Sequence, residues 1–304
     1  MQTWLVTGAN GFLGSNIGAG LKGKAHLVGM ARSAPASGLF DSFHQCDITD
    51  EIAVRAYLEV LNPDVVINTA AVANHEICEH QPALAHEINI GVAQSVASIS
   101  KDIHARFIHI STDAVFDGGA GNYSELDDPN PFSVYGQTKL DGERAVLERN
   151  AQALITRTNF FGWSPSGSKS ILEFFVHSLR EGKQVKGFTD FTVTSIYAQQ
   201  LVEVLWQLAY SPAFGLIHVG SSDSLSKYEF GLTVAKEFEL DASLITQSLA
   251  STGNVSVRRA RDLSLNTARL TEVMGFSPPT QLDGIRCAFQ QEDVLAKLIS
   301  GQPN

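Results

Sequence analysis

The chain has 304 residues and a mass of 32.8 kDa, enough to bury a sizeable core in one or two domains. Its composition, 44% hydrophobic and 18% charged, is typical of globular proteins and excludes the disordered and fibrous classes. The net charge is −10 and the basic residues are dispersed along the chain, which argues against an extended nucleic-acid surface. Cys46, Cys78 and Cys287 lack the spacing of a disulfide framework or a cysteine-rich zinc site. Their pattern favours a reducing cytoplasm.

The ends of the chain and its apolar runs predict neither a targeting segment nor a membrane anchor. The N-terminus leads directly into an apolar stretch and a glycine turn, without a basic leader or a small-residue cleavage site. No apolar run approaches the roughly 20 residues that a helix needs to cross a bilayer. We therefore expect a cytoplasmic protein that does not contact a membrane.

Short aliphatic runs alternate with longer segments of helical periodicity, which is the pattern of parallel βαβ units. The runs that we predict to be strands are Thr3–Val6, His26–Met30, Val65–Asn68, Arg106–Ile110, Ala153–Arg157 and Gly215–Val219. A helix over Val134–Arg149 is predicted to provide the crossover into the fifth of these. The predicted fold class is therefore α/β, with a doubly wound parallel Rossmann sheet whose ligands bind beyond the carboxyl ends of the strands.

After about residue 162 the alternating pattern becomes looser. Gly162–Lys169 is rich in Gly, Ser and Pro and predicts a loop, and Ile171–Arg180 has apolar residues at helical spacing. Residues 1–162 are predicted to form a dinucleotide-binding domain. Residues 163–304 are predicted to form mostly a smaller C-terminal substrate-binding cap, with segments near 190–219 returning to the sheet. We expect the cap to pack directly on the sheet, because no long linker precedes it.

A glycine-rich segment follows the first predicted strand and opens a helix. Gly8, Gly11 and Gly14 have Gly-x-x-Gly-x-x-Gly spacing, which permits a tight turn, close approach of a pyrophosphate and close packing of helix on strand. A merely flexible turn is the alternative, but strand, spacing and helix agree on a dinucleotide site. The residues predicted to contact the cofactor here are Gly8, Asn10, Gly11, Phe12, Leu13 and Gly14.

The ends of the next strands bear on which dinucleotide binds. Arg32 and Ser33 stand where an NAD site usually has an acidic residue for the ribose hydroxyls. A guanidinium and a hydroxyl suit the extra phosphate of NADP, so NADP(H) is favoured over NAD(H), the alternative being a solvated loop arginine. Four further residues are predicted to contact the dinucleotide: Asp47, Ile48, Ala70 and Ala71. For Asp47, a role as helix cap or turn former is an equal alternative.

Three residues form the predicted catalytic set. Tyr135 and Lys139 are one helical turn apart and share a face, and Thr112 follows the fourth predicted strand. A phenol with a pKa near ~10 is a poor acid–base at neutral pH, but an adjacent ammonium and an oxidised nicotinamide favour the phenolate. Lys139 would also anchor the ribose, and the Thr112 hydroxyl could orient a substrate carbonyl. A Tyr-x-x-x-Lys pair alone is more often a surface pair, worth ~0.2–0.5 kcal/mol.

Together these motifs resemble the extended short-chain dehydrogenase/reductase superfamily, and within it the dTDP-4-dehydrorhamnose reductases. The runs that carry the resemblance are Ser111 to Gly118, Tyr123-x-Glu125-x-Asp127 and Tyr135-Gly136-x-Thr138-Lys139, and weaker similarity covers nearly the whole chain. The resemblance implies Thr112, Tyr135 and Lys139 as catalytic residues and places Asp113 near a small-molecule nucleotide-sugar substrate. It implies NADPH-dependent reduction of a 4-keto nucleotide-activated deoxysugar. It is also the only basis for expecting a homodimer.

The chain departs from the resembled family at two places that bear on the substrate. Asn159 stands where rhamnose-pathway reductases have a Ser-Trp pair after Arg-Thr, and it is predicted to contact the substrate. The segment from Asn74 to Glu79 departs from the usual Val-Asp-x-Ala-Glu pattern. We predict no metal site, since the His and Glu residues over 75–80 are interpreted as a solvated helical face. Residues 188–197, with Asp190, Thr194 and Ser195, form another candidate approach to the substrate.

Two other functions use the same motifs. A nucleotide-sugar epimerase, or an epimerase-reductase, would share the tyrosine and lysine, but double-acting enzymes of this superfamily need a cysteine and a histidine. No cysteine lies near 113–135 in the sequence, which counts against that mechanism. Similar chains also serve as regulatory subunits of methionine adenosyltransferase while retaining a dinucleotide site. The complete set of Thr112, Tyr135 and Lys139 makes a non-catalytic subunit the weaker hypothesis.

Overall fold

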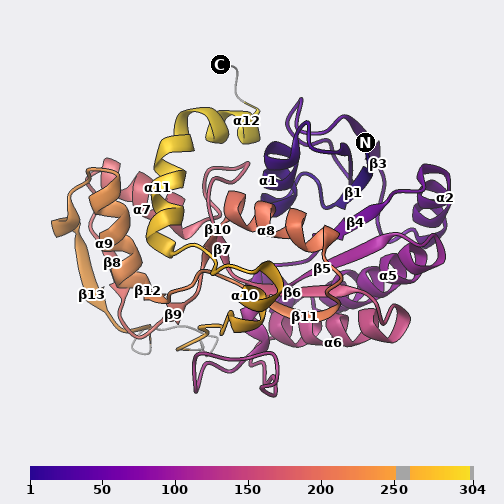
Figure 1. The fold of residues 1–304 in the computed structure, drawn as a ribbon. Helices are drawn as coiled ribbons and strands as arrows, with labels where there is room; N and C mark the ends of the chain where they lie inside the picture. The colour runs from indigo at the N-terminus through magenta and orange to yellow at the C-terminus, as the bar shows by residue number, and fades with distance from the viewer. Residues whose placement is uncertain (251–260, 302–304) are drawn as a thin grey trace.

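The computed structural model describes residues 1–250 and 261–301. Its centre is a seven-stranded sheet in the order β11-β6-β5-β4-β1-β2-β3, in which every pair of neighbours is parallel (Figure 1). The strands are β1 (Thr3–Thr7), β2 (His26–Ala31), β3 (Ser42–Gln45), β4 (Val65–Asn68), β5 (Arg106–Thr112), β6 (Leu154–Thr158) and β11 (Gly215–Val219). The predicted doubly wound parallel sheet is confirmed. Its order reverses between β1 and β4, the position at which such sheets bind ligands.

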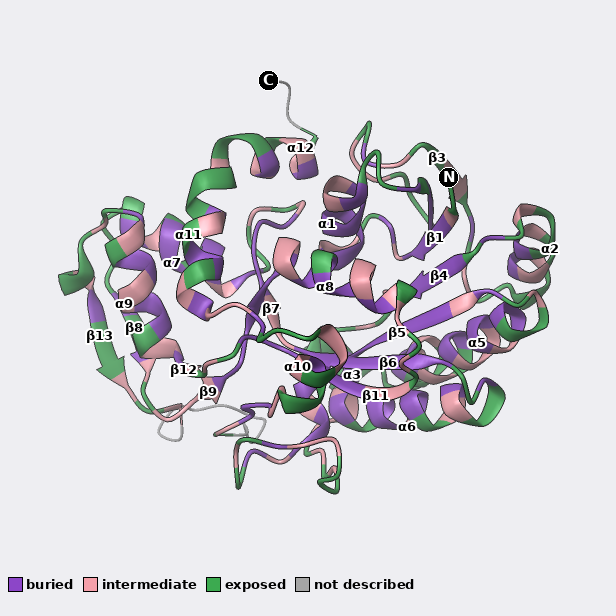
Figure 2. Ribbon diagram, in the orientation of Figure 1, coloured by how far each residue is buried: buried purple, intermediate pink, exposed green. Residues whose placement is uncertain are grey.

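Helices cover both faces of the sheet, so its central strands are buried on both sides (Figure 2). Side chains of a strand alternate between the faces. In β1, Trp4 and Val6 join one core cluster and Leu5 joins the other. The first cluster packs on α1 (Phe12–Leu21), α8 (Ala198–Tyr210) and α10 (Ala268–Met274). The second packs on α2 (Glu51–Leu61), α5 (Ala93–Asp102) and α6 (Val134–Arg149).

The connection from β4 to β5 is almost entirely helical. It consists of α3 (His75–His80), α4 (Pro82–His86), a π-helical turn (Glu87–Val92) and α5. Asn74 caps α3 by accepting a hydrogen bond from the Ile77 N–H at 3.0 Å. At the other end of α3, Glu79 accepts from the Val134 N–H at 2.9 Å. This bond ties the last turn of α3 to the first turn of α6.

The C-terminal part builds a third core cluster beside the sheet. The elements around it are α7 (Ile171–Arg180), β8 (Val185–Phe188), α9 (Lys227–Glu237), β13 (Ile245–Ser248) and α11 (Gln281–Gln291). Helices α7, α9 and α11 each begin with a capping box. Within α7, Phe175 belongs to this core whereas Phe174 and His177 are exposed. The domain boundary at residue 162 stays a prediction. The central sheet contains strands from both sides of it, because β11, after residue 162, pairs with β6, before residue 162.

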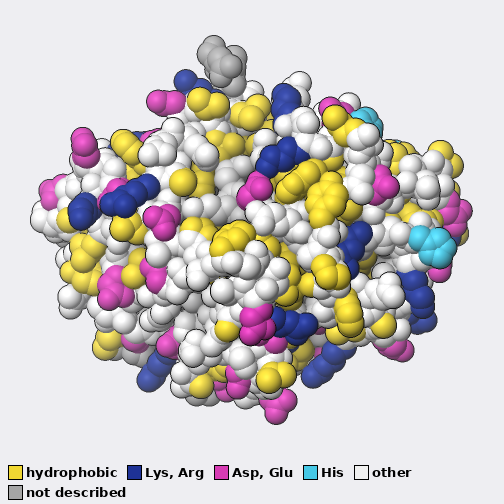
Figure 3. Space-filling model, in the orientation of Figure 1, with side chains coloured by type: hydrophobic (Ala, Val, Ile, Leu, Met, Phe, Trp, Pro, Cys, Tyr) yellow, Lys and Arg dark blue, Asp and Glu magenta, His cyan; other side chains and the backbone are white. Residues whose placement is uncertain are grey.

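Short elements complete the chain. They are β7 (Phe160–Phe161), β9 (Thr192–Val193), β10 (Ile196–Tyr197), β12 (Leu225–Ser226), α12 (Lys297–Ser300), the 3₁₀ turns Asp113–Val115 and Ala242–Leu244, and a π turn (Glu292–Ala296). None of the helices in the described ranges combines the length and apolar character needed to span a bilayer. On the face shown in Figure 3, basic side chains are dispersed among acidic and uncharged ones.

Candidate active site

The glycine turn joins β1 to α1 at the reversal in strand order. Gly8 has φ +67°, and a Cβ on it would lie 2.8 Å from Thr69 Oγ1 and 3.0 Å from the Ala70 nitrogen. A Cβ on Gly14 would lie 2.2 Å from the carbonyl oxygen of Gly8. Helix α1 begins at Phe12, after Gly11, and no side chain caps it. The N–H groups of its first turn are therefore available to an anion, and the two glycines are needed because side chains there would collide with neighbouring protein atoms.

Residues at the ends of β2 and β3 lie next to this turn. Asn10 Nδ2 donates to Ser33 Oγ at 2.6 Å, and Arg32 beside it is exposed. Asp47 accepts from the backbone N–H and the hydroxyl of Thr49 at 3.1 and 2.9 Å, as a turn-forming residue does. These bonds, with a smaller contribution from the Arg32 charge, lower the pKa of Asp47. The contact of Asp47 with the dinucleotide stays a prediction.

The remaining predicted cofactor residues follow β3 and β4. Ile48 is partly buried and packs on the second core cluster. Ala70 lies against Gly8 across the strand ends, and Ala71 is exposed. The Thr69 hydroxyl donates to the carbonyl oxygen of Thr7 at 2.6 Å, which joins the end of β4 to the end of β1. Small side chains thus line the surface beside the glycine turn, as the sequence predicts.

The three predicted catalytic residues lie together at the carboxyl end of β5. Ser133 caps α6 by accepting from the Gly136 N–H at 3.1 Å. A Cβ on Gly136 would lie 2.3 Å from the Ala114 carbonyl oxygen, so the first turn of α6 packs against the loop after β5. The Thr112 hydroxyl consequently reaches the phenol of Tyr135 and hydrogen-bonds it. Lys139 lies one turn further along α6 and is buried.

Burial has the largest effect on the ionisation of Tyr135 in the chain alone. Burial raises the pKa of the phenol to about 12, against the lowering effect of the Thr112 hydrogen bond, and the Asp113 carboxylate raises it further. The sequence prediction of a phenolate concerned Lys139 together with an oxidised nicotinamide, and it stays a prediction. Burial also lowers the pKa of Lys139 to about 8, which Glu143 partly opposes. The phenol is therefore protonated at neutral pH and can serve as an acid.

A buried polar cluster adjoins Thr112. Asp113 Oδ1 accepts from Thr112 Oγ1 at 3.1 Å, and Asp113 Oδ2 accepts from Asn159 Nδ2 at 2.8 Å. The Ser195 hydroxyl donates to Asn159 Oδ1 and closes the chain. Burial raises the pKa of Asp113 to about 6, and the Asn159 and Thr112 hydrogen bonds oppose this shift. The two residues predicted to contact substrate, Asp113 and Asn159, are thus brought to the catalytic set.

Of the three polar residues suggested in the 188–197 segment, only Ser195 joins this cluster. The Thr194 hydroxyl accepts from the Leu265 N–H at 3.1 Å. Asp190 accepts from the Ala250 N–H at 2.6 Å. These bonds hold the loops around β9, and an approach of Thr194 or Asp190 to the substrate stays a prediction. Sequence spacing could not separate the three, because the bonds that do so come from distant segments.

Two residues of α3 lie beside Tyr135 and were not predicted there. The imidazole of His75 packs on the phenol with ring centroids 4.7 Å apart and planes at 56°. The Cys78 thiol is close enough for its charge to raise the pKa of Tyr135. From the sequence spacing we expected no cysteine near this site, and that inference is wrong, because folding brings Cys78 close to Tyr135. The one signal in the sequence was that this segment departs from the resembled family's pattern.

The environment of Cys78 makes it an inert thiol. Its side chain is buried, Sγ donates to the Val72 carbonyl at 3.3 Å, and burial raises its pKa above the usual value. A neutral thiol is neither a base nor a nucleophile. The other polar residues of α3 are exposed, as predicted. Among the residues that the structure describes, no group of three or more His, Cys, Asp or Glu could hold a metal ion.

A buried ion pair fixes the rotation of α6. Glu143 accepts three bonds from Arg157, at 3.0 and 3.2 Å from Nε and 2.7 Å from Nη2, and a fourth from the Ser111 hydroxyl. The Arg157 guanidinium lies over the Phe116 ring, 4.9 Å from its centroid. Because Glu143 is one turn beyond Lys139, this pair sets the direction in which α6 presents Tyr135 and Lys139. The sequence contained both residues, but not their pairing.

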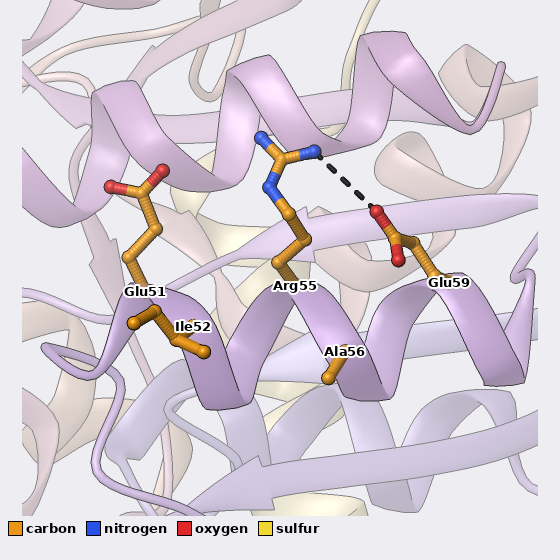
Figure 4. Close-up of a pocket in the computed structure, with 5 residues that line it drawn as sticks. All are labelled: Glu51, Ile52, Arg55, Ala56 and Glu59. Atoms are coloured by element: carbon orange, nitrogen blue, oxygen red, sulfur yellow. Dashed lines mark ion pairs between the residues drawn. The ribbon is translucent and has the colours of Figure 1, made fainter.

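A surface hollow on α2 is separate from this site. Figure 4 shows the five residues that line it: Glu51, Ile52, Arg55, Ala56 and Glu59. Arg55 Nη1 lies 3.7 Å from Glu59 Oε1 and 2.8 Å from Asp102 Oδ2, so its charge is already paired. The hollow contains none of the predicted cofactor or catalytic residues. We therefore locate the functional site at the glycine turn and the end of β5.

Comparison with known proteins identifies the family of the chain. The family model of the RmlD substrate binding domain matches residues 1–294. "Probable low-salt glycan biosynthesis reductase Agl14" of Haloferax volcanii is 34% identical over 286 residues, covering 92% of this chain and 95% of that protein. Methionine adenosyltransferase 2 subunit beta of Xenopus laevis is 30% identical, covering 79% and 73%. A crystal structure described as a hypothetical dTDP-4-dehydrorhamnose reductase from Sulfolobus tokodaii is 31% identical, with TM-score 0.82 and coverage of 93% and 99%. The chain therefore belongs to the family of the RmlD substrate binding domain, within the extended short-chain dehydrogenase/reductases.

Proposed function

We propose that the protein reduces a 4-keto nucleotide-activated deoxysugar to the alcohol with NADPH. The coarser statement, that it is an NAD(P)-dependent oxidoreductase, follows from its family. The observation that carries the finer proposal is the meeting of Thr112, Tyr135 and Lys139 at the end of β5, two strands from the glycine turn. A protonated phenol held by a hydroxyl at the carboxyl edge of the sheet is suited to a carbonyl.

The residues of this chain supply the proton and the orientation. Tyr135, protonated at neutral pH, donates its phenolic proton to the carbonyl oxygen of the substrate. The Thr112 hydroxyl, which donates its one proton to Asp113 in the chain alone, rotates to donate it to the same oxygen and stabilises the charge that develops there. Asp113 and Asn159 bind hydroxyl groups of the sugar, because both have hydrogen-bonding atoms next to Thr112. A nicotinamide dinucleotide bound on the glycine turn would supply the hydride.

The residues around the glycine turn support NADPH as the dinucleotide. Gly8 and Gly14 allow the turn after β1 and the start of α1 to pack closely, and the uncapped start of α1 suits the charge of a diphosphate. Asn10 of the glycine turn donates a hydrogen bond to Ser33, and Arg32 next to Ser33 is exposed. Arg32 and Ser33 together could hold the additional phosphate of NADP. Lys139 would hold the nicotinamide ribose. The homodimer implied by the family resemblance is a further part of this proposal.

An epimerase-reductase is the second candidate, because His75 and Cys78 lie beside Tyr135. That chemistry moves protons at the carbons next to the carbonyl and would exchange them with solvent. The buried thiol and its bond to the Val72 carbonyl favour simple reduction. Turnover in deuterium oxide separates the two candidates: reduction alone leaves the carbons beside the carbonyl without deuterium. A non-catalytic subunit, as in the methionine adenosyltransferase relative, would show no turnover.

The direct test is oxidation of NADPH, followed by its absorbance, with a panel of 4-keto nucleotide sugars. We expect Tyr135→Phe to lower kcat by at least about 100-fold, because general acid catalysis contributes about that much or more. The affinity for NADPH should remain within about twofold. Tyr210→Phe on α8 is the control, since Tyr210 is exposed and lies outside the site. Undiminished turnover of Tyr135→Phe would remove the proposed acid.

A further inference from the structure

A chain of buried polar side chains runs from the glycine-turn strand to Lys139. Thr7, Asn68 and His109 are directly opposite one another on β1, β4 and β5. Thr7 Oγ1 lies 2.6 Å from Asn68 Oδ1, and Asn68 Nδ2 lies 3.1 Å from His109 Nδ1. His109 Nε2 in turn lies 3.2 Å from Lys139 Nζ. All four side chains are buried, at most 2% exposed.

The hydrogen bonds in this row of four side chains all run in one direction, from Thr7 toward Lys139. The Thr7 hydroxyl donates to Asn68 Oδ1, which leaves the amide nitrogen of Asn68 to donate to His109 Nδ1. A neutral imidazole that accepts at Nδ1 carries its proton at Nε2. That proton can be donated to Lys139 Nζ only if Nζ is a neutral amine with a free electron pair. Nζ itself donates to the Ile110 carbonyl oxygen at 2.7 Å.

A protonated Lys139 requires the opposite direction. An ammonium has no free electron pair, so Nε2 must accept and the ring proton must move to Nδ1. Asn68 must then turn its amide, so that its oxygen faces the ring and its nitrogen faces Thr7. The ring cannot simply take up a second proton, because burial and the neighbouring Lys139 charge hold the pKa of His109 well below its usual value.

We propose that His109 is a positioning residue that holds Lys139 Nζ in both protonation states by exchanging its tautomer, with Asn68 turning in step. The proposal rests on the proposed function, in which Lys139 binds the dinucleotide ribose beside Tyr135. Within residues 1–250 and 261–301, the titratable groups that contact Lys139 or shift its pKa are His109 from β5 and Glu143 from its own helix, and Tyr135 lies one turn before it on α6. Glu143 is already engaged by Arg157 and Ser111, so it cannot replace His109 as a direct partner of Nζ.

Two substitutions of His109 each keep one of the two contacts that the imidazole ring makes, with Asn68 and with Lys139. In His109→Gln, an amide reaches the place of Nε2, can donate or accept there, and keeps the contact with Nζ. In His109→Asn, the amide reaches only the place of Nδ1, so it keeps the contact with Asn68 and loses Nζ. Because an ammonium depends more on its hydrogen bonds than an amine does, we expect the pKa of Lys139 to fall by about one unit in His109→Asn. It should stay near the wild-type value in His109→Gln.

Two readouts do not depend on turnover. NMR titration of protein labelled in the lysine side chains, with Lys139→Met for assignment, reports the Lys139 pKa. The ¹⁵N spectrum of the histidine rings reports the His109 tautomer in the wild-type protein. We expect the tautomer to exchange with the same midpoint as Lys139. We also expect the Kd for NADPH to rise about tenfold in His109→Asn and less than threefold in His109→Gln.

The proposal is overturned if the His109 tautomer stays constant while Lys139 titrates, or if the two variants have the same Lys139 pKa and the same Kd. Circular dichroism of both variants must match that of the wild type, and the wild-type titration tests the tautomer exchange even if His109→Asn fails to fold. If no keto sugar is turned over although the tautomer exchanges with Lys139, the proposed function fails and the positioning role stands.

Discussion

The substitution Gly14→Ala tests the dinucleotide site at its most crowded point. The added Cβ would lie 2.2 Å from the Gly8 carbonyl oxygen and 2.9 Å from the Ala9 Cα, whereas ordinary contact begins at 3.4 Å. The shortfall of about 1.2 Å is between two backbone segments, so no side-chain rotation can relieve it. Helix α1 must therefore move by about 1 Å away from the glycine turn. That movement displaces the N–H groups that would bind the diphosphate.

The expected effect on binding follows from this displacement. A misplacement of about 1 Å in a positioned site can cost about 100-fold. We therefore expect the Kd for NADPH to rise about 100-fold, equivalent to about 2.7 kcal/mol. Fluorescence titration with NADPH measures it, and circular dichroism with a thermal melt checks that the fold is retained. Gly91→Ala is the matched control, because a Cβ on Gly91 meets nothing within 4 Å.

A Kd within about threefold of the wild type in a well-folded Gly14→Ala protein would refute the assignment. In that case the diphosphate does not lie on this turn, and the glycine spacing serves only the packing of α1 on β1. Loss of binding in both the Gly14→Ala and the Gly91→Ala proteins would also count against it, since the contact at Gly8 would then not explain the effect.

Three further predictions follow from the buried charges and the exposed arginine. Glu143→Gln should lower the free energy of unfolding, measured in urea, by about 3 kcal/mol, because it leaves the buried Arg157 charge without a carboxylate. Asp141→Asn is the control: Asp141 belongs to an exposed ion pair, so this change should lower the free energy of unfolding by less than about 1 kcal/mol. Because burial raises the pKa of Asp113 from 3.8 to about 6, the wild type should lose about 3 kcal/mol of stability as pH rises from about 4 to about 6. Urea unfolding at a series of pH values measures this loss, and an equal dependence of stability on pH in Asp113→Asn would contradict the prediction. Arg32→Ala should raise the Kd for NADPH about tenfold and leave that for NADH within twofold; equal weakening of both would exclude a contact with the extra phosphate.

Local features of the sequence were enough to predict the strands, the glycine turn and the helix on which Tyr135 and Lys139 are one turn apart. Each depends on residues within one turn or one strand: apolar runs, glycine spacing, and the i, i+4 rule that puts two side chains on one helix face. The structure accordingly has strands at all six predicted places and α6 over the predicted range. Such short-range rules act before any tertiary contact forms.

The partners of these residues depend on strand order and register, which no local rule contains. Asn68 meets His109 because β4 and β5 are neighbours in one register, and a shift by one residue would turn one of these side chains to the other face. His75 reaches Tyr135 only because α3 packs beside α6. The pKa of Tyr135 shows the same division. Its spacing from Lys139 is local, but its burial, which raises that pKa, is a property of the assembled core.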